Sequence, residues 1–266
     1  MTNAKNKRSF KKTLILLLGL LLILTTVDHI FLKTKRLKTQ KITITDKTIP
    51  PSFDGAKILV FSDVYDNVSQ LEKVKTLVDK VKPDFIINLG NLMSEDFEDK
   101  DLIEMNLREM DAPFGKYTLL SNEDLELADD LKSLYYNAEF RVQYNSMPKV
   151  YRGENEAIRF VFLQSEEAYE NALELNQETF NLGFAYDANQ IDHKYPLHTL
   201  ITSNNQTSMV NIPFLKDYLY ESDYLKKHEV VSGVHLRQTS GISSFDEDFR
   251  LFSTPDILVL TLRSSE

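Results

Sequence analysis

Short apolar blocks alternate with amphipathic segments along most of the chain. The run from Ile58 to Phe61 is apolar at every position, which is typical of a buried strand. Behind it, apolar residues recur at helical spacing from Val68 to Val81, and Asn67 stands where an N-cap belongs. A second apolar run covers Phe85 to Leu89. Residues 57–91 therefore form a predicted strand–helix–strand unit, which implies parallel pairing of the two strands.

The same kind of pattern continues to the C-terminus. A helix is predicted over residues 102–110, and a weakly alternating strand over 43–48 ends at a Pro-Pro pair. Further strands are predicted at 117–120, 158–163, 198–201, 229–232 and 257–262. Because no internal repeat or low-complexity linker divides this region, we expect one α/β domain over residues 42–266.

The N-terminal block has a different character. Thr13 to Val27 is predominantly apolar and continues weakly to Leu32, which gives about 20 residues, enough to cross a bilayer as a helix. A cleaved signal peptide is the alternative, but no small-x-small cleavage site follows the leucine-rich stretch. We therefore expect a basic tail at 1–12 and an uncleaved transmembrane anchor at 13–32, with the membrane as a partner.

Basic residues flank this anchor equally on both sides. Five precede it (Lys5, Lys7, Arg8, Lys11 and Lys12) and five follow it (Lys33, Lys35, Arg36, Lys38 and Lys41). The positive-inside rule therefore does not decide the orientation. Since a short basic N-terminus before a first span usually stays inside, we expect a single-pass protein of the cell membrane with its domain outside. The second cluster lies in a basic juxtamembrane spacer at 33–41, which either contacts anionic lipid, at about 1 kcal/mol per charge, or is simply solvated.

Charge and cysteine content remove several classes of function. The chain has 31 basic and 40 acidic residues, and residues 1–41 hold ten of the basic residues and one of the acidic ones. The remaining domain is strongly acidic, so we expect no nucleic-acid partner. With no cysteine, disulfides and thiolate metal sites are excluded.

Polar residues follow several of the predicted strands. In open α/β sheets, ligands collect beyond the carboxyl ends of the strands. The candidate cluster consists of Asp63, Asn91, Asn122, Asn204 and Gly233. Such residues are also common turn formers and helix caps, so their position alone does not establish a site.

Six phrases, taken in order, resemble the calcineurin-like metallophosphoesterases, in particular a membrane-anchored bacterial branch. They are FDGAKILVFSDVY, KPDFIINLGNLM, APFGKYTLLSNED, HTLITSNN, EVVSGVHLRQ and RLFSTPDILVLTL, and the resemblance spans roughly residues 42–263. It implies a four-layer α/β/β/α sandwich that holds two metal ions and hydrolyses phosphate esters or pyrophosphates. It also implies five sequence motifs that supply the metal ligands.

The first three of these motifs keep their places but lose most of their ligands. The Asp-x-His motif reads Asp63-Val64-Tyr65, and the Gly-Asp motif reads Gly90-Asn91. The Gly-Asn-His-Asp motif reads Ser121-Asn122-Glu123-Asp124, with Glu123 at the position of the catalytic histidine.

The last two motifs are lost as well. The fourth-motif histidine is replaced by Asn204, or by Asn205 with a shift of one residue, and Gly-His-x-His reads Gly233-Val234-His235-Leu236. Of the seven metal-ligand positions that the resemblance implies, only Asp63 and Asn122 keep their residue type.

These replacements remove the chemistry that a two-metal hydrolase needs. Such an enzyme requires two cations held by a bridging anion and enough donors to activate a shared water. Asn91 is neutral, and Val234 and Leu236 carry no donor atom. We therefore expect no metal cofactor, with Asp63, Asn91 and Asn122 as remnant positions. Glu123 and Asp124 belong to this degenerate site, and Glu123 is expected to cap the next helix rather than to transfer protons.

Two classes of function remain open. The favoured hypothesis is an inactive, membrane-anchored phosphoesterase homologue that serves as a binding or regulatory protein at the cell envelope, with an unidentified protein or small-ligand partner. The alternative is an active phosphoesterase or pyrophosphatase acting on a phosphodiester or lipid pyrophosphate. Its reduced Mg²⁺ or Mn²⁺ site would use Asp63, Asn91 and Asn122 as oxygen ligands.

Overall fold

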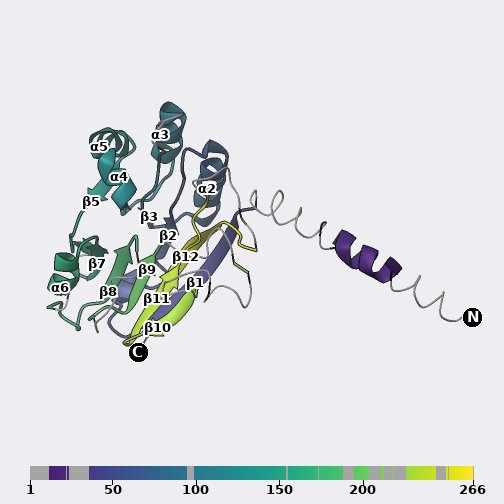
Figure 1. The fold of residues 1–266 in the computed structure, drawn as a ribbon. Coiled ribbons are helices and arrows are strands. Elements are labelled where there is room, and N and C mark those ends of the chain that lie inside the picture. The colour runs from purple at the N-terminus through teal and green to yellow at the C-terminus, as the bar shows by residue number, and fades with distance from the viewer. Residues whose placement is uncertain are drawn as a thin grey trace, which may run out of the picture.

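Two six-stranded mixed sheets, which we call sheet A and sheet B, form the body of the protein (Figure 1). The computed structural model describes residues 12–21, 23, 36–94, 99–153, 155–172, 174–187, 195–203, 211–212, 218, 226–243, 250 and 252–265. Sheet A has the strand order β1 (Lys38–Asp46), β12 (Asp256–Ser264), β2 (Lys57–Phe61), β3 (Phe85–Asn88), β4 (Gly115–Leu119), β5 (Phe140–Gln143). Its pairings are parallel except between β12 and β2.

Sheet B pairs strands from the C-terminal half of the chain. Its order is β10 (His228–Val231), β11 (Val234–Gln238), β9 (Thr199–Thr202), β8 (Asn181–Ala185), β7 (Ala157–Leu163), β6 (Lys149–Tyr151). The two outermost pairings are antiparallel and the three inner ones are parallel. The carboxyl ends of β7, β8, β9 and β11 therefore lie at one edge of the sheet.

Helices cover the outer faces of the two sheets. On sheet A these are α2 (Val68–Val81), α3 (Lys100–Arg108) and α5 (Ala128–Asn137), with the short α4 (Asn122–Glu126) before α5. On sheet B, α6 (Glu166–Ala172) packs against β7. A 3₁₀ turn, η2 (Pro51–Phe53), links β1 to β2.

Aromatic side chains fill the space between the two sheets. Phe160 of β7 lies at the centre of this cluster, with no exposed surface. Its ring meets those of Phe85, Phe184 and Tyr117 edge-on, at centroid distances of 5.1, 5.3 and 5.7 Å. Edge-to-face pairs add to the free energy gained from burying apolar area. This cluster fixes sheet A against sheet B, and therefore fixes the loops that follow their strands.

The local predictions around residues 57–91 are confirmed. Strand β2 pairs in parallel with β3, and α2 begins directly after Asn67, whose side chain accepts a hydrogen bond from the Gln70 backbone N–H at 3.0 Å. The predicted α/β class is confirmed as well.

The start of the domain differs from the expected one. Strand β1 begins at Lys38, so residues 38–41 belong to sheet A rather than to a spacer. Long-range pairing explains this: Lys38 lies opposite Asp256 in the register with β12, and Gln40 Nε2 donates to Asp256 Oδ2 at 2.8 Å. The hydrophobic pattern of residues 38–41 does not by itself indicate that they pair with β12.

The sequence pattern did not predict strand β8, because its middle residue is Gly183. A Cβ at this position would lie 2.7 Å from Leu200 Cδ1 and 3.0 Å from Leu197 Cδ1, so the neighbouring leucines occupy the space that a side chain would take. The glycine that permits this packing also interrupts the apolar run.

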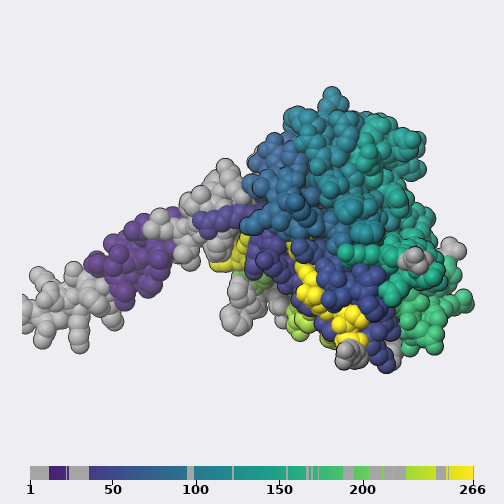
Figure 2. Space-filling view, turned by 180° about the vertical axis from the view of Figure 1, so that it is seen from behind, coloured from purple at the N-terminus to yellow at the C-terminus, as the bar shows by residue number. Residues whose placement is uncertain are grey.

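The segment predicted to be an anchor is described only in part. Residues 12–21 and 23 are helical and exposed, and in Figures 1 and 2 they stand apart from the two-sheet domain. Positions 22 and 24–32 of the predicted anchor lie outside the described residues. Within the part of the chain that the structure describes, no helix is long and apolar enough to cross a membrane.

The aromatic cluster gives a test of what holds the two sheets together. Replacing Phe160 with alanine is expected to lower the free energy of unfolding by about 3–5 kcal/mol, because it leaves a cavity between the sheets. Chemical denaturation measures this loss. Tyr136→Ala is the matched control, since Tyr136 is 83% exposed and its loss should change stability by less than about 0.5 kcal/mol. Equal effects of the two changes would contradict this account of the core.

Candidate functional site

The carboxyl ends of strands from both sheets meet at one place. Asp63 follows β2, Asn91 follows β3 and Ser121 follows β4 in sheet A, while Tyr186 follows β8 and Ser203 follows β9 in sheet B. Hydrogen bonds connect the side chains of all five residues. The sequence-predicted residues Asp63 and Asn91 are thus brought together as expected.

Asp63 is held by hydrogen bonds to both of its carboxylate oxygens. Oδ2 accepts from Ser62 Oγ at 2.7 Å and from Ser203 Oγ at 2.5 Å, and Oδ1 accepts from Asn91 Nδ2 at 3.0 Å. Burial raises the pKa of this carboxyl group, while the three hydrogen bonds and the charge of Arg250 oppose the rise. Asp63 therefore belongs to a closed polar network.

Asn91 lies at the centre of that network. Its Nδ2 donates to Asp63 Oδ1 and to the hydroxyl groups of Tyr65 and Tyr186, so two protons are shared among three acceptors. Its Oδ1 accepts from Ser121 Oγ, and its backbone N–H donates to Asp124 Oδ2 at 2.7 Å. The Asn91 amide therefore joins the first-motif aspartate to the third-motif loop, and it is 1% exposed.

Tyr65 and Tyr186 approach Asn91 from different sheets. Burial, followed by the negative charges of Asp63 and Glu123, raises the pKa of both phenols, so they stay neutral. Tyr65 also donates to Glu123 Oε2 at 3.3 Å. Two neutral hydroxyl groups and one amide thus surround the buried carboxylate.

Ser121 and Asp124 form the cap of helix α4. Ser121 Oγ accepts from the Asp124 N–H at 3.0 Å, and Asp124 Oδ2 accepts from the Ser121 N–H at 2.8 Å. The cap predicted for Glu123 is therefore wrong, because Glu123 is exposed and faces Tyr65 instead. Burial raises the pKa of Asp124, which its backbone hydrogen bonds partly offset. Asn122 is the first residue of α4, and its side chain lies outside the described set.

The backbone around this network is unusual. Asp63, Tyr65, Asp66 and Asn91 all have positive φ angles, between 45° and 57°. Non-glycine residues seldom adopt this region, and such residues cluster at functional sites. Gly90, at φ 109°, fits because a Cβ there would lie 2.8 Å from the Ser121 backbone nitrogen.

The family resemblance places Val234 and Leu236 where the fifth motif, Gly-His-x-His, has its histidines. This prediction is wrong. Both side chains are buried with the apolar cluster on the outer face of sheet B, and Gly233 lies in the turn between β10 and β11. Because β11 runs parallel to β9, this turn lies at the end of the sheet opposite to Ser203. The fifth motif therefore cannot reach Asp63 from there.

The strands that do reach Asp63 from sheet B are β8 and β9. Tyr186, directly after β8, stands where a histidine that follows a strand would face the site. Ser203, directly after β9, donates to Asp63 and is followed in the sequence by Asn204 and Asn205, the positions that the resemblance gives to the fourth motif. Asn204, Asn205 and Gln206 lie outside the described residues. Sequence reasoning missed Tyr186 because it did not identify β8, and it passed over Ser203 in favour of the next residue, Asn204.

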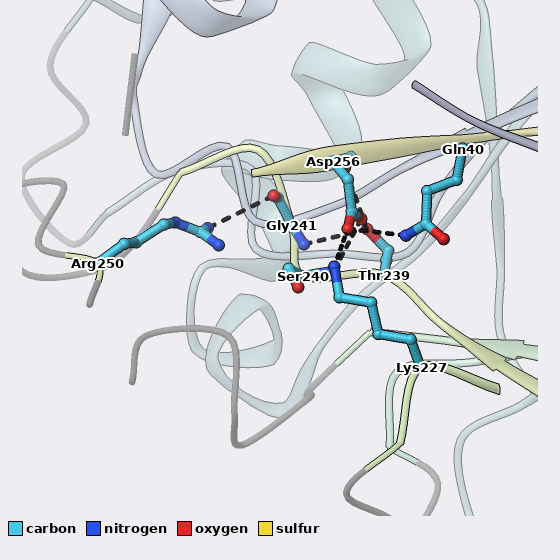
Figure 3. Close-up of polar contacts among 7 residues, drawn as sticks. All are labelled: Gln40, Lys227, Thr239, Ser240, Gly241, Arg250 and Asp256. Atoms are coloured by element: carbon cyan, nitrogen blue, oxygen red, sulfur yellow. Dashed lines mark hydrogen bonds and ion pairs between the residues drawn. The ribbon is translucent and has the colours of Figure 1, made fainter. Parts of the chain in front are cut away.

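Asp256 is a second buried carboxylate, and its hydrogen bonds hold the segment that leads to Gly241 (Figure 3). Asp256 Oδ1 accepts from Thr239 Oγ1 at 2.8 Å and from the Ser240 N–H at 3.0 Å, while Oδ2 accepts from Gln40 and Lys227. These bonds tie the ends of β1, β11 and β12 to each other. The sequence contains Asp256 within RLFSTPDILVLTL, but nothing in that phrase marks it as buried.

Gly241 and Arg250 complete this support. A Cβ on Gly241, which has φ 68°, would lie 2.6 Å from Asp63 Cβ, so only glycine fits against the carboxylate. Arg250 is 1% exposed and donates to the carbonyl oxygens of Gly241 and Ser243. Its positive charge lowers the pKa of Asp63 against the effect of burial.

The donors that the structure describes do not fit a dinuclear metal centre. Among the residues that the structure describes, no three His, Asp or Glu side chains lie close enough together to hold a metal ion. Both oxygens of Asp63 already accept hydrogen bonds, and Asn91 turns its nitrogen rather than its oxygen toward Asp63. An amide N–H is a donor with no lone pair to offer a cation. Asp63, Asn91, Ser121 and Ser203 thus serve as hydrogen-bond partners for one another.

Comparison with known proteins points to metallophosphoesterases. The chain is 24% identical over 253 residues to the uncharacterized metallophosphoesterase YkuE of Bacillus subtilis, covering 88% of each chain. It is 27% identical over 97 residues to an uncharacterized metallophosphoesterase of Aquifex aeolicus, covering 35% of this chain and 37% of that one. No family model matches. The similarity to YkuE supports the metallophosphoesterase relationship over most of the chain.

Solved structures overlap with this one only partially. The protein TT1561 of Thermus thermophilus gives a TM-score of 0.46 at 10% identity, over 71% of this chain and 90% of that one. A structure described as a novel archaeal phosphodiesterase gives 0.40 at 13% identity, over 70% and 84%. These overlaps carry no functional argument.

The buried state of Asp63 predicts a pH dependence of stability. Because the folded pKa of Asp63 is raised above the unfolded value of about 3.9, its stabilising contribution is fully present at low pH and is lost as pH rises through the folded pKa. The Asp63→Asn variant lacks this titration. We expect its stability relative to the wild type to improve as pH rises above the unfolded pKa of about 3.9, by about 1.4 kcal/mol for each unit of pKa shift.

Urea unfolding at a series of pH values measures this difference. Asp129→Asn is the matched control, because the Asp129 carboxylate is exposed, and it should leave the pH profile of stability unchanged. A pH-independent difference between Asp63→Asn and the wild type would contradict the buried, raised-pKa carboxyl group.

Proposed function

We propose that this protein is a membrane-anchored metallophosphoesterase homologue that has lost its dinuclear metal centre and acts as a binding or regulatory protein at the cell envelope. The observation that carries the proposal is the position of the Asn91 side chain. It bonds Asp63 on one side and Ser121 on the other, at the meeting point of the strand ends. A neutral amide there replaces the bridging carboxylate that the family resemblance implies.

Two further features support a non-catalytic role. Hydrolysis by a two-metal site depends on a water whose pKa is lowered by the cations. Here the neutral phenols of Tyr65 and Tyr186 lie beside Asn91, and neither supplies a negative or imidazole ligand. Glu123, at the position of the catalytic histidine, is bonded to Tyr65. The polar network is therefore complete without an ion.

The proposal includes a membrane anchor in the N-terminal segment. We propose that residues 13–32 hold the chain in the cell membrane as a single pass, with the N-terminus inside and the domain outside. Arg36, Lys38 and Lys41 are exposed at the start of β1, where they can lie on anionic lipid. The partner in this proposal is a protein or a small ligand at the membrane surface.

Metal binding tests the proposal directly. Full-length protein in detergent, treated with a chelator and then given Mn²⁺, Zn²⁺ or Mg²⁺, should bind no stoichiometric ion, show no rise in Tm and release no product from a chromogenic phosphodiester. The Tyr65→His, Asn91→Asp double variant returns two donors to the site. We expect it to bind Mn²⁺ at least about tenfold more tightly than the wild type in calorimetric titration.

Tyr136→His with Asn137→Asp is the matched control, since it makes the same changes on the exposed face of α5 and should not change Mn²⁺ affinity. The proposal fails if the wild type binds a divalent ion stoichiometrically and hydrolyses the phosphodiester, with Asp63→Ala abolishing both.

Membrane association has its own test. Deletion of residues 1–32 should move the protein from the membrane fraction to the supernatant on centrifugation of cell lysates. In the full-length chain, Arg36→Gln, Lys38→Gln and Lys41→Gln together should weaken contact with anionic lipid by about 1 kcal/mol per charge without releasing the chain. A full-length protein recovered in the supernatant would contradict the anchor.

A further inference from the structure

A hollow lies at the opposite end of the domain from Asp63. It has a volume of about 320 Å³ and is lined in part by Asp46, Asn181, His198 and His235. Strand β1 runs from Lys38, opposite Asp256 in the register, to Asp46, opposite Ser264. Since Asp256 belongs to the support of Asp63, the length of β1, about 26 Å, separates the hollow from that support. In Figure 1, this is the end at which the C-terminus lies.

Asn181, which lines the hollow, has an unused hydrogen-bond acceptor. Its Nδ2 donates to the carbonyl oxygens of Asn176 and Pro196, both at 2.9 Å, which fixes the orientation of the amide. Its Oδ1 is buried and accepts no hydrogen bond from any residue that the structure describes. A buried acceptor without a partner costs about 1–3 kcal/mol, so a ligand that donates to it would recover that free energy.

Stacked imidazole rings form another part of the lining. The rings of His198 and His235 lie 5.6 Å apart with an interplanar angle of 22°. His228 stacks on His235 at 5.9 Å but does not line the hollow. Burial lowers the pKa of His198 in spite of the nearby Asp46 carboxylate. Together with Pro196 and Leu197, these rings present an apolar surface beside the polar groups.

The lining selects for a ligand without net charge. One carboxylate, Asp46, and one ammonium group, Lys47, balance each other, and the other polar groups are amides, hydroxyls and imidazoles. Such groups suit hydroxyl groups, each of which donates and accepts hydrogen bonds. The volume lies at the lower end of the range of about 300–1,000 Å³ for small-molecule pockets.

We propose that this hollow binds a small, neutral polyhydroxylated molecule such as a single sugar unit. Ring C–H groups pack on the imidazoles and prolyl surface, while hydroxyl groups bond to Asn181 Oδ1 and to the Asp46 carboxylate. This site contains none of the residues of the Asp63 network, so it goes beyond the function proposed above and does not depend on it.

The test follows the histidine ring signals by NMR. Full-length protein labelled at its five histidines, in a detergent without a sugar headgroup, is titrated with glucose, mannose, N-acetylglucosamine and ribitol. At least one of these probes should shift the His198 and His235 signals saturably and leave His29 unchanged. His235→Ala and Thr179→Ala, both in the lining, should each weaken binding by about tenfold, whereas His228→Ala should change it by less than about twofold.

Three results would overturn the proposal. One is that no probe gives a saturable shift, and another is tighter binding of glucose 6-phosphate or glucosamine than of glucose, which would assign a charged ligand. The third is binding that survives unchanged in both lining variants. Because the signals report on His198 and His235 directly, these outcomes are independent of metal binding at Asp63.

Discussion

A buried carboxylate has to be stabilised by hydrogen bonds and nearby positive charge, and this constraint shapes the whole Asp63 region. Burial penalises the charged form of Asp63, and the penalty is opposed by Ser62, Ser203 and Asn91, with Arg250 behind them. Each of these groups comes from a different part of the chain. The two sheets must therefore be packed in register before the carboxylate has its partners, which links the aromatic core at Phe160 to the site.

The backbone around Asp63 adopts conformations and close approaches that few residue types allow. Asp63, Tyr65 and Asn91 retain left-handed conformations, and Gly90 and Gly241 retain close approaches that a Cβ would block. Strained conformations persist only where the surrounding structure determines them. Here the determinants are hydrogen bonds among side chains, in which the Asn91 amide takes the central place. The region is therefore held together by hydrogen bonds among its own polar groups.

Local sequence patterns predicted the parts of the fold that depend on local physics. The strand–helix–strand unit at 57–91, the Asn67 cap and the placement of Asp63 and Asn91 at strand ends all follow from hydrophobic spacing and capping preferences. Tyr186, Ser203, Arg250 and Asp256 could not be found in this way. Their roles depend on which strands are neighbours, and β8 was hidden by Gly183. The fifth motif was assigned to Gly233, which lies at the end of sheet B opposite to Ser203.

The central claim is that the Asn91 side chain, and not a cation, joins Asp63 to the third-motif loop. A crystal structure of the protein grown with excess Mn²⁺, with anomalous diffraction recorded near the manganese edge, tests this most directly. The account predicts no anomalous peak near Asp63, with Asn91 Nδ2 directed at Asp63 Oδ1 and Asn91 Oδ1 at Ser121. An anomalous peak within coordination distance of Asp63, with Asn91 turned to present its oxygen, would contradict it.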